Sequence, residues 1–178
     1  ALSKAINVIN IDAHTDLRNT AEGRHSGNGF SNAIEQGFLH QYRIFGLQQN
    51  YLNENISQQI QSSENIKTAF FEDILVDDRN VTQQWTDFTA DLSNPCGLEI
   101  DLDSIENILS SAVSPSGFRI NDIRKILLGN QNPFSYLHIC EGSVALADGR
   151  EDVTTGKTIA YLLSDFIKAL LPRIYPQP

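Results

Sequence analysis

Two carboxylates and an imidazole are concentrated in the short stretch 12–16. This stretch directly follows the apolar run 5–11, which predicts a buried strand. Residues two apart on a strand point the same way, so we expect Asp12 and His14 to lie side by side at its carboxyl end. Asp16 can return to the same spot once the chain turns. Side chains of these types, gathered in one place, suit a hard or borderline divalent metal.

A second pair of carboxylates, Asp101 and Asp103, follows another apolar strand. Taken alone, this pair is better explained as a turn and a helix cap. Combined with the first cluster, it favours metal ligation, because the carboxyl ends of parallel strands meet at one edge of a sheet. Two carboxylate-rich strand ends therefore predict a two-metal hydrolytic centre.

The bulk composition is that of an ordinary globular protein, and 178 residues fit a single domain spanning 1–178. The net charge of −9 argues against nucleic acid and anionic membranes as partners. No apolar run is long enough to span a bilayer, and the N-terminus shows no signal-peptide pattern. Cys96 and Cys140 are expected at opposite ends of parallel strands and therefore as free thiols. We expect a cytoplasmic protein.

Short apolar runs alternate with helical patterns along the chain. Strands are predicted at 5–11, 42–47, 67–73, 96–101 and 135–140. Helices are predicted at about 29–37, 52–63, 80–92, 119–129 and 155–171. This alternation, with nearly continuous apolar strands, predicts an α/β fold whose parallel sheet is covered by helices on both faces.

Further polar residues are expected near the same edge. The Gly-containing loop after the first cluster offers His25, Ser26 and Asn28, and it should overhang the site. Arg18 fits either a solvated surface position or a bidentate contact with a substrate carboxylate. Glu141, after the last strand, fits either a solvated loop or a hydrogen bond to a cationic substrate nitrogen.

The order and spacing of these motifs resemble the arginase, agmatinase and formimidoylglutamase (ureohydrolase) family. The resemblance is carried by residues 10–16, 26–28, 100–104 and 139–141, and it covers nearly the whole chain. It implies a three-layer α/β/α fold with two Mn²⁺ ions at the carboxyl edge of the sheet. Family members hydrolyse an amidine or guanidine C–N bond with a metal-bridging hydroxide.

The resemblance also implies a role for each motif residue. The implied metal ligands are Asp12 and Asp101, bridging both ions, His14 and Asp103 at one ion, and Asp16 at the other. The implied catalytic residues are Asp16, which orients the hydroxide, Glu141, which holds the cationic nitrogens of the substrate, and Asp103. Since the leaving nitrogen needs a proton, Asp103 is a candidate to carry it.

This chain departs from the family pattern in three places. The family has a further metal-binding His on an upstream strand, and the chain starts too late to contain it. We therefore expect the N-terminal part of the fold to be missing and one Mn²⁺ or none to be retained. Arginases also carry a His at the position of Phe30, and acids where this chain has the acid-free run 48–51. A substrate with a free α-amino group is thus disfavoured.

The resulting prediction is a formimidoylglutamase-like enzyme that hydrolyses N-formimidoyl-L-glutamate to glutamate and formamide. The predicted substrate-binding residues are Arg18, His25, Ser26 and Asn28. A cation near Asp16, as in the run Asp16-Leu17-Arg18, resembles formimidoylglutamases and suits an acidic substrate. An agmatinase-like or arginase-like guanidino hydrolase is the alternative within the class. A catalytically silent metal-binding fragment or interaction module is the alternative outside it.

The resemblance finally implies the strand order 135–140, 96–101, 5–11, 42–47, 67–73. In this order the apolar strand 135–140 becomes an exposed edge, although its composition suits a central position. An unpaired edge of that kind recruits another strand. We therefore expect a homo-oligomer joined through this edge.

Overall fold

The computed structural model describes residues 4–174 of the chain. Its strands form a single parallel sheet in the order β3-β2-β1-β4-β5. They are β1 (Ile6–Ile11), β2 (Leu39–Leu47), β3 (Ile66–Phe70), β4 (Cys96–Asp101) and β5 (Tyr136–Cys140). Both the parallel α/β sheet and the predicted strand order are confirmed, and the sheet is wholly parallel.

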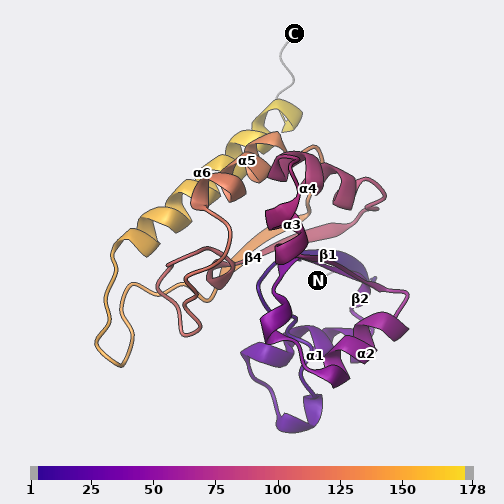
Figure 1. Cartoon of the computed structure of the whole chain (residues 1–178). Coiled ribbons are helices and arrows are strands. Elements are labelled where there is room, and N and C mark those ends of the chain that lie inside the picture. The colour runs from indigo at the N-terminus through magenta and orange to yellow at the C-terminus, as the bar shows by residue number, and fades with distance from the viewer. Residues whose placement is uncertain (1–3, 175–178) are drawn as a thin grey trace.

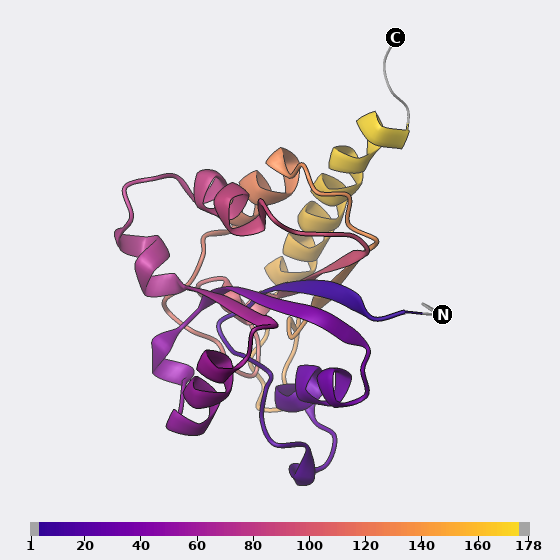
Figure 2. The ribbon, with the colours of Figure 1, turned by 90° about the vertical axis from the view of Figure 1, so that its right-hand side faces the viewer.

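Helices flank the sheet on its two faces, which gives the predicted three-layer arrangement (Figure 1). One face carries α3 (Phe71–Val76), α4 (Val81–Thr89), α5 (Ile120–Gly129) and α6 (Thr154–Ile174). The other carries α1 (Gly29–Glu35) and α2 (Glu54–Ser62). Short 3-10 turns lie at Thr20–Glu22, Ser26–Asn28, Gln49–Tyr51 and Leu102–Ser104. In the view of Figure 2, α1 and α2 lie on the opposite side of the sheet from α4–α6.

The central strand β1 divides the core because its side chains alternate between the two faces. Ile9 and Ile11 join the cluster under α4, α5 and α6, which also holds Trp85. Val8 joins the cluster on the other face together with Tyr42. Every side chain of β1 is buried, which explains why its sequence reads as a nearly continuous apolar run.

Two element boundaries differ from the prediction. The strand predicted over 67–73 ends at Phe70, and Phe71 begins the short helix α3. The Phe71 ring packs edge-on against Phe118 at 5.2 Å between ring centroids. Phe71 therefore packs into the core as a helix residue and not as a strand residue. The second strand starts at Leu39, earlier than predicted, because Leu39 already pairs with Ile6 of β1.

Helices cover both faces of the sheet, as predicted, but the edge strand β5 is less buried than the central strand β1. The side chains of β5 are half-buried or exposed, in contrast to those of β1. Cys96 begins β4 and Cys140 ends β5, and both are free thiols. No helix within residues 4–174 has the length and apolar character needed to cross a membrane.

Candidate metal centre

The two acidic motifs leave neighbouring strands at the same edge of the sheet. β1 and β4 are paired in register, so Asp12, directly after β1, and Asp101, at the end of β4, lie next to each other. Asp12 Oδ1 accepts a hydrogen bond from the His14 backbone N–H at 2.7 Å. Asp101 Oδ1 accepts one from the Asp103 backbone N–H at 3.0 Å. The same local turn therefore places His14 beside Asp12 and Asp103 beside Asp101.

The predicted ligands form two overlapping groups. Asp12, His14 and Asp103 make up the first, called here the histidine group. Asp12, Asp16 and Asp101 make up the second, the carboxylate group. Within each group, one ligand atom from each residue lies within 4.8 Å of the others. Since Asp12 belongs to both groups, the arrangement fits two neighbouring ions that share one carboxylate.

The carboxylate group concentrates negative charge in a buried place. Burial raises the pKa of Asp16 to about 8 and that of Asp101 to about 9, and the charge of Asp12 adds to both shifts. Burial also raises the pKa of Asp12 itself. Shifts of this sign mean that the ionised carboxylates lack sufficient compensation from the protein. A divalent cation supplies that compensation.

The histidine group holds its imidazole between two carboxylates. His14 Nδ1 lies 3.6 Å from Asp12 Oδ1 and 3.2 Å from Asp103 Oδ2. Burial alone lowers the pKa of His14, but the hydrogen bonds to Asp103 and Asp12 outweigh it and raise the pKa to about 10. The ring of Tyr51 packs against His14 at 4.2 Å between centroids. In this position a metal ion can replace the proton on the imidazole.

A buried oxygen without a partner gives an independent test of whether a metal fits. Asp103 Oδ1 is buried and has no hydrogen-bond partner within the described chain. Asp12 is 0% exposed, and Asp101 and Asp103 are each 4% exposed. Buried carboxylates are costly unless they are paired or coordinate a metal. Carboxylate oxygens together with one imidazole nitrogen are a donor set suited to Mn²⁺, so the residues present fit such an ion.

Two residues of the site have strained backbone. Asp16 has φ 52° and Glu141 has φ 59°, in the left-handed region that residues other than glycine seldom adopt. Within the described residues, Asn107 is the one further non-glycine residue with positive φ. Because strain of this kind concentrates at functional sites, it supports a functional position for Asp16 and Glu141.

A cavity of about 220 Å³ lies over the ligands. Its lining includes Arg18, His25 and Ser26, three of the predicted substrate-binding residues, together with Glu141. Ser111 also lines it, and its hydroxyl donates a hydrogen bond to Glu141 Oε2 at 3.4 Å. The structure thus gathers the predicted cation and the predicted carboxylate around one space beside the metal ligands.

Asn28 lies apart from that cavity lining and is fully buried. Its side chain accepts a hydrogen bond from the His25 backbone N–H at 3.1 Å and donates one to the Gly23 carbonyl at 2.6 Å. These bonds hold the loop that carries His25 and Ser26. A direct contact of Asn28 with substrate stays a prediction.

Asn10 and Tyr51, for which no role was predicted, contact the predicted ligands Asp12 and His14. Asn10 Nδ2 donates a hydrogen bond to Asp12 Oδ2 at 2.7 Å. A signal for this contact was available, because Asn10 precedes Asp12 by two residues and so shares its face of the strand. Tyr51 gave no local signal, since only the 3-10 turn after β2 brings its ring against His14.

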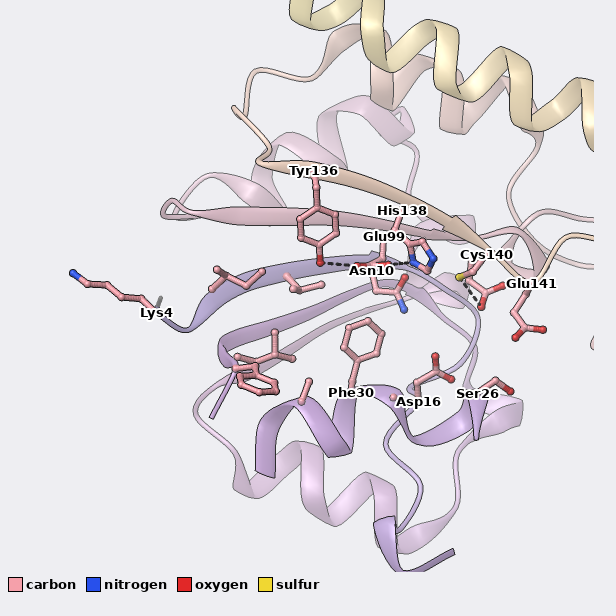
Figure 3. A pocket seen from close by; sticks show the side chains of 17 residues that line it. Lys4, Asn10, Asp16, Ser26, Phe30, Glu99, Tyr136, His138, Cys140 and Glu141 are labelled. Atoms are coloured by element: carbon pink, nitrogen blue, oxygen red, sulfur yellow. Dashed lines mark hydrogen bonds and ion pairs between the residues drawn. The ribbon is translucent and has the colours of Figure 1, made fainter. Parts of the chain in front are cut away.

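A second, larger cavity of about 640 Å³ adjoins the first (Figure 3). The two cavities share Asp16, Ser26, Asp101 and Glu141. The larger one runs along the face of β1, β4 and β5, with Phe30 of α1 on its opposite wall. The candidate metal centre is therefore open toward this face as well as toward its own cavity.

A polar group interrupts the wall of the larger cavity. Glu99 Oε1 accepts a hydrogen bond from the Tyr136 hydroxyl at 2.6 Å, and Glu99 Oε2 pairs with His138 Nδ1. The His138 side chain is 60% exposed although it lies within a strand. β5 lies at the edge of the sheet, and the His138 ring lines the larger cavity.

An all-parallel α/β sheet with an acidic centre at its carboxyl edge matches one known class. The model of the arginase family matches residues 1–161, and the chain belongs to this family. No curated protein matches its sequence.

Solved structures share the fold at low identity. A formimidoylglutamase from Bacillus subtilis superposes with a TM-score of 0.78 at 17% identity, covering 96% of this chain and 54% of that one. A hypothetical agmatinase from Burkholderia thailandensis gives 0.79 at 14% identity, with 98% and 53% covered. A Trypanosoma cruzi formiminoglutamase with Mn²⁺ gives 0.78 at 16% identity, with 93% and 56% covered. The chain therefore spans about half the length of these structures.

Proposed function

We propose that this chain carries the metal centre of a Mn²⁺-dependent hydrolase of linear amidine C–N bonds, with N-formimidoyl-L-glutamate as substrate. The observation that carries the proposal is the pair of ligand groups sharing Asp12. The similarity in fold to formimidoylglutamases, one of them described with Mn²⁺, supports it.

The reaction needs an activated water, a held substrate and a proton for the leaving nitrogen. Divalent ions held by the two groups would supply Lewis-acid polarisation and would make a bound water acidic enough to react at neutral pH. Glu141, where the two cavities join, accepts hydrogen bonds from the cationic amidine. Arg18 grips a carboxylate of the glutamyl part with its planar fork. Asp16 orients the water, and Asp103 accepts the proton that this water loses and passes it to the leaving nitrogen.

We further propose that the histidine group binds Mn²⁺ more tightly than the carboxylate group. An imidazole nitrogen raises the preference for transition metals, whereas three carboxylates alone bind Mg²⁺ and Mn²⁺ with little distinction. One ion is then retained at low metal concentration. Activity of this chain by itself is expected to be low, because the larger cavity leaves the Asp16 and Glu141 side of the centre open to water.

A guanidino substrate is the second candidate, and the similarity in fold to an agmatinase favours it. A catalytically silent metal-binding or interaction module is the third. It is favoured by Phe30, which stacks on Tyr42 at 4.2 Å between centroids in place of the His of arginases. An aromatic ring in this packing carries no proton and binds no metal.

The test is hydrolysis by the purified chain at saturating Mn²⁺, with N-formimidoyl-L-glutamate, agmatine and L-arginine as parallel substrates. We expect slow release of formamide from the first and no urea from the others. Asp12→Asn serves as the matched blank, since it removes the ligand shared by both groups. Urea release in place of formamide establishes the guanidino alternative. Equal rates for wild type and Asp12→Asn refute metal-dependent hydrolysis.

We also propose that residues 1–178 act as one domain in the cytoplasm. The two free thiols support this location, because disulfides are rare in reducing compartments.

A further inference from the structure

The loop between Asp16 and α1 places the predicted cation, Arg18, between two cavities. Arg18 lines the cavity of about 220 Å³ over the metal ligands, called here the ligand cavity. It also lines a neighbouring cavity of about 590 Å³, which lies between the same loop and α2. Ile56 of α2 lines both of them as well. The long Arg18 side chain can therefore serve either space, and the contacts that hold it decide which one.

Gly27 provides the surface on which the Arg18 side chain lies. A Cβ atom added at Gly27 would lie 3.2 Å from Arg18 Cδ and 3.3 Å from Arg18 Nε. Both distances are tighter than ordinary van der Waals contact. On its other side the same atom would meet His25 Cε1 at 3.5 Å, which is an ordinary contact. Gly27 and His25 line the ligand cavity and not the neighbouring one, so the Arg18 side chain rests on the wall of the ligand cavity.

The absence of a side chain at Gly27 matters for space and not for backbone conformation. Glycine is usually required where φ is positive, because other residues are strained there. Gly27 is not among the glycines with positive φ, whereas Gly23, four residues earlier in the same loop, has φ 82°. An alanine could therefore adopt the Gly27 backbone, and the cost of its methyl group would come from the crowding of Arg18.

Hydrogen bonds hold the backbone around Gly27 in place. The Arg18 N–H donates to the Gly27 carbonyl at 3.0 Å, and the Asn28 N–H donates to the His25 carbonyl at 3.2 Å. The buried Asn28 side chain also donates to the Gly23 carbonyl at 2.6 Å. Since these bonds fix Gly27 and the residue after it, a methyl group at position 27 would displace the flexible Arg18 side chain and not the loop.

We propose that Gly27 is a positioning residue that holds the Arg18 guanidinium in the ligand cavity and thereby favours acidic over cationic substrates. The inference rests on the proposed function, in which Arg18 grips a carboxylate of the substrate. A guanidinium and a carboxylate bind through two parallel hydrogen bonds, so a small displacement of the planar fork weakens the pair. The class of ligand is an amino acid with two carboxylates and a substituted nitrogen.

The test is the binding of N-acetyl-L-glutamate to the Mn²⁺-loaded chain, measured by isothermal titration. This probe keeps both carboxylates of the proposed substrate and carries an amide in place of the amidine. Gly27→Ala should weaken its binding by about three- to tenfold, because the methyl group displaces the Arg18 fork. Gly29→Ala is the matched control. Gly29 has φ −56°, and a Cβ added there meets no atom within 4 Å, so the affinity should change by less than about twofold.

A double-mutant cycle shows whether Gly27 acts through Arg18. In the Arg18→Ala background, Gly27→Ala should have no further effect on the binding of N-acetyl-L-glutamate. A methyl group that obstructs the ligand directly would weaken binding in both backgrounds. Gly27→Ala alone should leave the affinity for Mn²⁺ unchanged and should not weaken the binding of agmatine, a cationic probe. A general disturbance of the loop would reduce all three affinities together.

Four results overturn the proposal. They are no binding of N-acetyl-L-glutamate to the wild type, unchanged binding in Gly27→Ala, an equal loss in Gly29→Ala, and a loss that persists in the Arg18→Ala background. All of them are binding measurements, whereas the proposed function fails when no formamide is released. The two failures are therefore distinguishable.

Discussion

The histidine group and the carboxylate group share Asp12 but differ in how their negative charge is offset. In the histidine group, His14 lies between Asp12 and Asp103, and its proton offsets part of their charge. In the carboxylate group, Asp16 and Asp101 face Asp12 without a cation of their own, and their pKa values rise to about 8 and about 9.

The difference indicates how each group behaves without metal. A proton on His14 keeps the first group assembled, with the pKa of the imidazole raised to about 10. The second group holds together at neutral pH only when its carboxylates are protonated or a cation is bound. The histidine group is therefore the more organised site, and the carboxylate group depends more on the ion it is proposed to bind.

The largest expected effect comes from Asp12→Asn, which affects both groups. Loss of a shared ligand should lower Mn²⁺ affinity by more than about 100-fold, beyond what loss of an outer hydrogen bond costs. The metal-free fold should survive, because an amide has the same shape and still accepts the His14 N–H. Isothermal titration with Mn²⁺ measures the first effect and thermal melting the second. Retained affinity would show that Asp12 is not a shared ligand.

A matched pair of variants separates the groups. His14→Ala should weaken the tightest Mn²⁺ site by about 10–100-fold, because it removes the nitrogen ligand. Asp16→Asn should leave that site within about tenfold of wild type, since Asp16 belongs only to the carboxylate group. Titration of both variants gives the ranking directly. The reverse ranking would place the tighter ion in the carboxylate group.

Stability of the metal-free chain should depend on pH in a defined direction. Asp101 and Asp16 have pKa values raised from 3.8 to about 9 and about 8, so they bind protons more tightly in the folded state. Their contribution to stability is complete below the unfolded value and is lost as pH rises through the folded values. His14, raised from 6.5 to about 10, acts in the same direction.

Urea midpoints at about pH 5, 7 and 9 in the presence of EDTA should therefore decrease. The stabilisation added by Mn²⁺ should increase over the same series, because a metal needs deprotonated ligands. A metal-free midpoint that rises from the lowest to the highest pH would contradict the assigned burial of the carboxylate group.

The smallest expected effect comes from Asn10→Ala. Its hydrogen bond to Asp12 orients a ligand of both groups, so both affinities should fall together by about tenfold. Asn7→Ala is the matched control, because Asn7 is a buried asparagine of the same strand whose side chain bonds Ser93 and no ligand. An effect confined to one group would mean that Asn10 does not act through Asp12.

Much of the fold was predictable because its signals are local. The alternation of apolar runs and amphipathic stretches fixes the parallel sheet, and the family resemblance fixes the strand order. The start of α3 was not predictable from pattern, because the apolar run 69–71 suits the end of a strand and the start of a helix equally well. At the start of α3, Phe71 makes a ring contact with Phe118, which is distant in sequence and therefore not visible in the local pattern.

The candidate site divides in the same way. Spacing after a strand predicted Asp12, His14 and Asp16. The same spacing after a second strand predicted Asp101 and Asp103. Tyr51 and Ser111 could not be predicted in this way, because loops from other parts of the chain bring them to the site. The Glu99–His138 pair could not be predicted either, since it depends on which residues of β4 and β5 lie opposite each other.

The most direct test of the central claim is anomalous diffraction from crystals of the chain grown with Mn²⁺, recorded near the manganese absorption edge. The account predicts an anomalous peak bounded by Asp12, His14 and Asp103, and a weaker one beside it bounded by Asp12, Asp16 and Asp101. Manganese peaks only elsewhere, or none at this edge of the sheet at saturating Mn²⁺, would contradict it.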